Sequence, residues 1–87
     1  MIVRIFSLKK GLEIIENVIA IRIKSKDYHL LILKDYVSHI GEIHGDLEIE
    51  LENDILSFNG IDAMFINDNN VFNVIYEEEK WLIIILN

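Results

Sequence analysis

Apolar and polar residues alternate along most of the segment from Ile32 to Ile75. A strand places successive side chains on opposite faces, so this alternation predicts strands with one apolar and one polar face. The breaks in the alternation hold Gly, Asn and Asp, which are residues that favour turns. The segment therefore predicts consecutive antiparallel strands.

The alternation is clearest in residues 47–52, where Leu or Ile occupies every odd position and Glu every even position. A helix would spread the apolar residues Leu47, Ile49 and Leu51 around its circumference, whereas a strand places them on one face. Three equivalent glutamates on a wet face do not provide the two unlike carboxylates that acid–base catalysis needs. We therefore interpret them as a solvated strand face.

The same pattern predicts about nine or ten short strands in the whole chain. With regular spacing, no proline and no helical period, they predict an all-β fold. We expect a small two-sheet antiparallel β-sandwich or flattened barrel, formed by residues 1–87 as a single domain. The predicted strands are residues 2–8, 12–15, 18–24, 28–33, 37–43, 47–52, 55–58, 61–66, 71–76 and 81–86.

Glycine and asparagine predict where these strands bend or end. Gly41 is expected to form a bulge, and the tripeptide 44–46 is expected to form a turn. Asn59–Gly60 tolerates positive φ at both positions and is expected to join or kink two strands. The run Asn67–Asn70 is the strongest turn signal in the chain.

Composition adds an apolar excess to this picture. The apolar fraction of 52% is above the usual range for a globular domain, which indicates a dry core together with apolar surface left for a partner. The stretch Trp81–Leu86 is apolar on both faces, so the last predicted strand is central in a sheet or covered by a partner.

Charge is distributed unevenly along the chain. Residues 1–34 hold seven basic and three acidic side chains, whereas residues 35–87 hold one basic and twelve acidic side chains. The total of −7 argues against nucleic acid as a partner, because phosphate binding relies on clustered Lys and Arg. The basic third fits either a solvated surface or the acidic surface of another protein.

The sequence contains no recognisable reaction centre. It has no cysteine, which excludes thiol catalysis and thiolate metal sites. His29, His39 and His44 do not have the spacing of a known metal motif, no serine lies in a strained glycine-flanked turn, and no Gly-rich loop opens a helix. We therefore expect no catalytic, cofactor-binding or metal-binding residues.

Two aromatic residues beside charged turns, Tyr36 and Trp81, are candidates for a protein interface, where aromatic side chains are enriched. The N-terminus lacks the pattern of a secretory leader, and the longest apolar run is far shorter than the roughly 20 residues of a membrane helix. We therefore expect a protein without a membrane insertion that is cytoplasmic, or peripheral on the inner face of a membrane within a complex.

Residues 28–49 resemble the central segment of the epsilon subunit of F-type ATP synthases. The pattern of that family runs through an apolar pair, a Pro-Gly-His-Ala-Pro loop, a short strand, a glycine turn and Leu-x-Ile. The corresponding pieces here are Ile32–Leu33, residues 34–38, His39–Ile43, Gly45–Asp46 and Leu47–Ile49. Asn59–Gly60 falls near the Gly-Gly of the family, and residues 69–75 are similar to its next hairpin.

The resemblance covers about residues 1–76 and implies the N-terminal β-sandwich domain of that family. It departs from the pattern in residues 34–38, which lack the prolines, glycine and histidine of the family loop. The C-terminal helical hairpin of the family has no counterpart in residues 77–86, so regulation of ATP hydrolysis by that element is not implied.

By this resemblance the protein is a non-catalytic rotor subunit that binds the gamma subunit of the central stalk, with one end facing the ring of membrane subunits. The implied contact residues are Lys26, Asp27, Tyr28, His29, Asp35 and Tyr36, to which Trp81 is added as an interface aromatic. Two other functions stay open: an unrelated assembly module that self-associates through Trp81–Leu86, and a small hydrolase that uses Glu or His.

Overall fold

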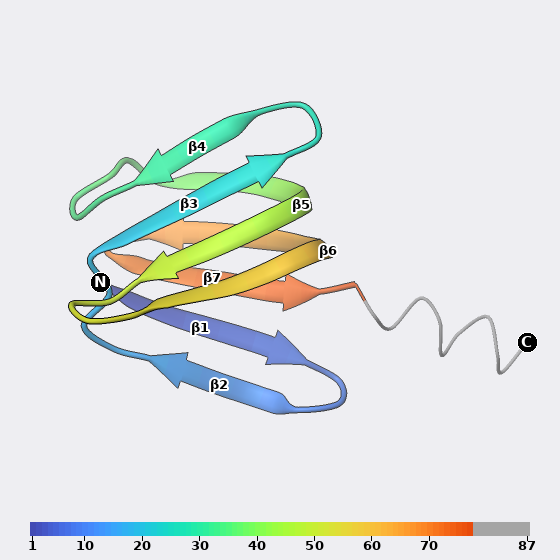
Figure 1. Cartoon of the computed structure of the whole chain (residues 1–87), viewed down its shortest axis with the longest axis horizontal. Coiled ribbons are helices and arrows are strands. Elements are labelled where there is room, and N and C mark those ends of the chain that lie inside the picture. The colour runs from blue at the N-terminus through green and yellow to red at the C-terminus, as the bar shows by residue number, and fades with distance from the viewer. Residues whose placement is uncertain (78–87) are drawn as a thin grey trace, which may run out of the picture.

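Residues 1–77 are described by the computed structural model, and they form one open sheet of seven strands (Figure 1). The strand order across the sheet is β2–β1–β7–β6–β5–β3–β4. The strands are β1 (Ile2–Ser7), β2 (Gly11–Ile15), β3 (Ala20–Ser25), β4 (His29–Ile32), β5 (His39–Glu50), β6 (Ile55–Asp68) and β7 (Val71–Tyr76).

The all-β class predicted from the alternation is confirmed, but the strands are not arranged as the expected two-sheet sandwich. The described residues form one sheet with seven strands, not two sheets with nine or ten. The sheet is also mixed, because β1 and β7 run parallel while the other neighbours are antiparallel. The predicted strand 81–86 lies outside the described residues.

The strand count is lower because β5 and β6 each span two predicted strands. Gly45 pairs with Ile61 and Leu47 pairs with Phe58, so Asn59 and Gly60 together lie opposite a single residue of β5. This is a β-bulge, which bends a pair of strands without ending it. The kink expected at Asn59–Gly60 is confirmed, and the turn expected at residues 44–46 is wrong.

The glycine of the bulge has the backbone conformation that the sequence indicated. Gly60 has a φ of 62°, in the left-handed region that glycine adopts without strain. Its N–H donates a hydrogen bond to Asp46 Oδ1 at 3.0 Å, which satisfies a backbone donor that the bulge removes from the ladder. The turn predicted at Asn67–Asn70 is confirmed, since Asn69 and Asn70 have φ values of 47° and 64° between β6 and β7.

Gly41 has a different role from the one predicted. The pairing of β5 with β6 is regular around it, so there is no bulge at this position. A Cβ atom on Gly41 would lie 2.6 Å from Cε1 of Phe65, on the opposite strand. Because Gly41 has no side chain, the Phe65 ring can pack directly over its backbone.

The core lies on the concave face of the sheet, which curves so that its two ends share one hydrophobic cluster (Figure 1). In β1 the alternation is complete, with Val3, Ile5 and Ser7 buried and the residues between them exposed. Phe65 and Phe72 stack with ring centroids 5.3 Å apart. The largest buried apolar side chains are Val3, Ile21, Ile23, Ile32, Ile43, Leu47, Ile49, Phe65, Phe72 and Val74.

Candidate functional site

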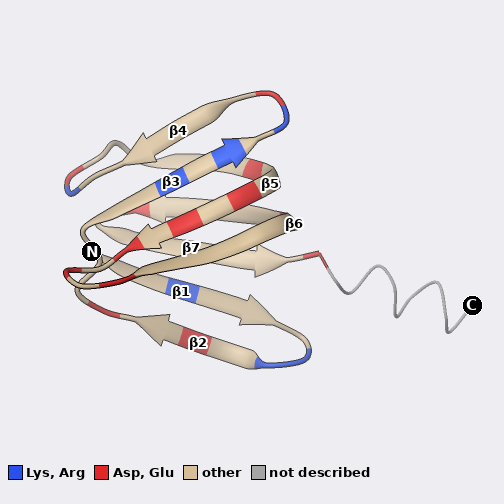
Figure 2. Cartoon of the chain, viewed as in Figure 1, with Lys and Arg blue, Asp and Glu red and all other residues tan. Residues whose placement is uncertain are grey.

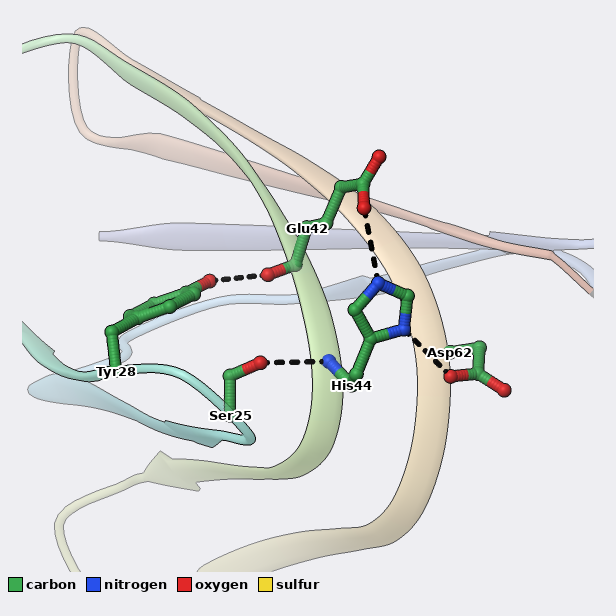
Figure 3. Close-up of polar contacts among 5 residues, drawn as sticks. All are labelled: Ser25, Tyr28, Glu42, His44 and Asp62. Carbon is green, nitrogen blue, oxygen red and sulfur yellow. Dashed lines mark hydrogen bonds and ion pairs between the residues drawn. The ribbon is translucent and has the colours of Figure 1, made fainter.

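Polar side chains gather around His44 on the convex side of β5 and β6 (Figure 3). Glu42 and His44 are two residues apart on β5, and therefore point to the same face. Asp62 lies directly opposite His44 on β6. Register alone thus brings two carboxylates to one imidazole.

Both nitrogens of the His44 ring face carboxylate oxygens. Nδ1 lies 2.8 Å from Asp62 Oδ1, and Nε2 lies 3.0 Å from Glu42 Oε2. The hydrogen bond to Asp62 has the largest effect on the pKa of His44 and that to Glu42 the next largest, and both raise it above its ordinary value. An imidazole can donate from both nitrogens only when it is protonated, so the arrangement favours the imidazolium form.

Ser25 and Tyr28 complete the cluster by tying the β3–β4 hairpin to β5. The Ser25 hydroxyl accepts a hydrogen bond from the backbone N–H of His44 at 2.9 Å, and the Tyr28 hydroxyl donates to the backbone carbonyl of Glu42. Burial raises the pKa of Tyr28. The Ser25 hydroxyl therefore faces the backbone of His44 and not its ring, which differs from the geometry that activates a nucleophile.

The three histidines do not converge. His39 stacks on Phe65 with ring centroids 5.6 Å apart, His29 begins β4, and His44 lies in the cluster just described. Within residues 1–77 no group of three or more His, Asp or Glu side chains is arranged to hold a metal ion. In the same part of the chain, no helix is long and apolar enough to cross a bilayer.

We expect the His44 cluster to make stability depend on pH. The folded-state pKa of His44 is raised, so its contribution is complete below the ordinary pKa of about 6.5 and is lost as pH rises through the folded-state value. Urea unfolding at about pH 5.5 and about pH 8.5 tests this. His44→Gln should lower the free energy of unfolding more at the lower pH, whereas an equal loss at both would contradict the assignment.

The predicted contact residues lie in two loops that the structure separates. Lys26, Asp27, Tyr28 and His29 lie at the start of β4, and residues 33–38 follow its end (Figure 1). Lys26, Asp27 and His29 are exposed, whereas Tyr28 is half-buried. The resemblance implied that both loops lie at one end of the domain. In the structure they lie at opposite ends of β4 (Figure 1).

The second loop is held by residues of the β6–β7 turn. Asp35 has a φ of 64°, and its N–H donates to Asn70 Oδ1 at 2.6 Å. Asn70 Nδ2 donates in return to Asp35 Oδ1 at 3.0 Å, and Ser38 donates to Asp68 at 2.6 Å. Asp35 is therefore engaged within the fold, while Tyr36 is half-buried against the core. Trp81, the remaining candidate, lies outside the described residues.

The composition predicted exposed apolar surface without locating it, and the structure places such a surface on the convex side of β2, β1, β7 and β6. Register aligns Leu12, Phe6, Ile75 and Met64 in one row, and Ile14 and Ile66 in the next row beside Arg4 and Asn73. Ile40 on β5 extends the second row. We call this surface the outer apolar patch, defined by Phe6, Leu12, Ile14, Ile40, Met64, Ile66 and Ile75.

Each side chain of the outer apolar patch is between 38% and 67% exposed. Figure 2 shows no charged residue on β7, and among the charged positions that adjoin the patch are Arg4 in its second row and Glu42 beside Met64. One signal in the sequence indicated it: residues 63–66 are apolar at four consecutive positions, so both faces of that strand are apolar. Contiguous apolar surface of this kind marks interaction sites.

Comparison with known proteins assigns no family to the chain. No protein-family model matches it, and no curated protein matches it.

Proposed function

We propose that this protein is a non-catalytic, protein-binding subunit of the central stalk of a rotary ATPase, with a gamma-type subunit as its partner. The observation that supports this is the order in which the pieces of the resemblance occur along the folded chain. The protein would act in the cytoplasm, or peripherally on the inner face of a membrane within the complex.

The proposal is supported by the chain order of these pieces, although Gly45–Asp46 lies within β5 and not in a turn. Ile32 of the apolar pair ends β4, residues 33–38 lie between β4 and β5, and β5 begins at His39. Leu47 and Ile49, which follow the glycine, are buried in the core. Downstream, Asn59–Gly60 forms the bulge of β6, and Asn69–Asn70 forms the turn before β7.

The curved sheet also supports the stiffness that a rotor subunit needs. The resemblance implies a two-layer sandwich, and we propose that the two ends of this sheet serve as the two layers. Val3 and Val74 at one end and Ile21 and Ile23 at the other belong to one buried cluster. Close-packed interiors of this kind deform little under load.

Purification of the tagged chain from its native cells, followed by mass spectrometry, tests the proposal. We expect the alpha, beta and gamma chains of an ATPase among the stable partners, and no ATP hydrolysis by the isolated protein. A stable set of partners without any ATPase chain would overturn the assignment.

A pair of charge reversals tests the proposed contact loop. Lys26→Glu changes an exposed lysine of the β3–β4 hairpin, and Lys9→Glu makes the same change in the β1–β2 hairpin. We expect the first variant to recover at most about a tenth of the partner and the second to behave as wild type, since a tenfold loss of affinity needs about 1.4 kcal/mol, which a close charge pair at an interface can contribute. Equal recovery by both would remove this loop from the interface.

The alternative function is a self-associating assembly module that uses Trp81–Leu86. The outer apolar patch favours it, because exposed apolar surface is also what a second copy would bury. Light scattering separates the two functions. Stable symmetric oligomers that disappear when Leu82→Lys and Ile84→Lys are combined would favour the alternative.

A further inference from the structure

The described chain ends beside the outer apolar patch. Ile75, in the first row of the patch, is two residues before Glu77, whose N–H donates to the Asp62 carbonyl at 3.0 Å. Phe6 and Leu12 lie next to Ile75 across the sheet. Whatever follows residue 77 therefore starts at the edge of the patch.

The remaining chain has the composition and the length to cover this surface. Residues 78–87 include Trp81–Leu86, six consecutive apolar residues. Ten residues can reach about 33 Å when extended. The rows from β2 to β5 cross four strand spacings, roughly 19 Å. A connection through residues 78–80 therefore leaves the apolar stretch within reach of every patch residue.

Tethering favours this segment over any separate molecule. A segment attached through a short connection has an effective concentration of roughly millimolar, well above the concentration of a second copy in a dilute solution. Covering the patch would bury the apolar side chains of both surfaces and remove water from each. A second copy would bury a similar area, but its concentration in solution is much lower than the effective concentration of the attached segment.

We propose that Trp81–Leu86 packs across the outer apolar patch of its own chain, over β6, β7, β1 and β2. The inference goes beyond the proposed function and holds for the isolated protein, so its tests are independent of any ATPase partner. The segment acts as a covering element that keeps this face of the sheet from water and from a second copy.

Trp81 reports on this directly, because it is the single tryptophan of the chain. In the monomer we expect the fluorescence emission of Trp81 to be blue-shifted and only weakly quenched by acrylamide. Neither property should change when the protein is diluted. Phe6→Lys should shift the emission to the red and raise the quenching constant several-fold. Leu31→Lys is the matched control, since Leu31 is 47% exposed on the convex side of β4 while Phe6 is 45% exposed.

Three results would overturn the proposal. One is a solvent-exposed Trp81 in the monomer, and another is a buried Trp81 that Phe6→Lys and Leu31→Lys affect equally. The third is burial that appears only with oligomers in light scattering, which would assign the patch to a second copy.

Disulfide trapping gives a second test that does not introduce a charge into the patch. The chain has no cysteine, so a pair of introduced cysteines reports only on its own distance. Ile84→Cys should crosslink within the monomer to Phe6→Cys or Ile75→Cys under mild oxidation, and not to Leu31→Cys. Failure of both patch pairs, or equal crosslinking to all three positions, would contradict the proposal.

Discussion

Gly45→Ala should destabilise the protein by about 3 kcal/mol or more. A Cβ atom on Gly45 would lie 2.2 Å from the carbonyl oxygen of Lys24, and 3.2 Å from Cα of Ser25. Both atoms belong to the backbone of β3, which pairs with β5 at this point, so the clash cannot be relieved by a change of rotamer. The substitution must separate two central strands or twist them, and urea unfolding should show the loss as a lower midpoint.

Gly60 offers the matched control. It has a φ of 62° but no atom within 4 Å of an added Cβ, so Gly60→Ala introduces conformational strain without a clash. We expect a loss of about 1–2 kcal/mol, and a smaller loss for Gly60→Asn because asparagine tolerates the left-handed region. A Gly45→Ala variant no less stable than Gly60→Ala would show that β3 and β5 are not in close backbone contact.

The local part of the fold could be predicted because alternation is a property of adjacent residues. The buried positions Leu47 and Ile49 and the turn at Asn69–Asn70 follow from the residues themselves. The continuity of β5 could not be predicted in this way. Gly45–Asp46 reads as a turn when β5 is considered alone, and becomes a bulge only through its pairing with Asn59–Gly60.

The candidate sites depend still more on pairing between distant residues. His44 meets Asp62 because β5 and β6 have one particular register, which neither strand specifies by itself. The outer apolar patch depends on the parallel pairing of β1 with β7, which places Phe6 beside Ile75. Phe6 and Ile75 are ordinary exposed side chains when taken singly. Their significance comes from the strand order, which alternation does not determine.

Phe65→Ala should lower the free energy of unfolding by about 3–5 kcal/mol. Phe65 is fully buried and stacks on both His39 and Phe72, so removing its ring leaves a cavity at the centre of the cluster. Met64→Ala is the control on the adjacent position, because Met64 points to the convex face and is 42% exposed. It should change stability less, by about 1 kcal/mol, since Met64 lies outside the buried cluster that holds Phe65.

A double-mutant cycle with Gly41 separates the ring contact from general loss of packing. An added Cβ on Gly41 would meet Phe65 at 2.6 Å from Cε1 and 2.7 Å from Cζ, so Gly41→Ala should cost about 1–3 kcal/mol in the wild-type background. In the Phe65→Ala background the clashing ring is absent, and the new methyl group enters the cavity. We therefore expect Gly41→Ala to be neutral or stabilising there, which gives a coupling energy of at least about 1 kcal/mol. Additive losses would mean that the Phe65 ring does not lie over Gly41, and the role assigned to this glycine would be wrong.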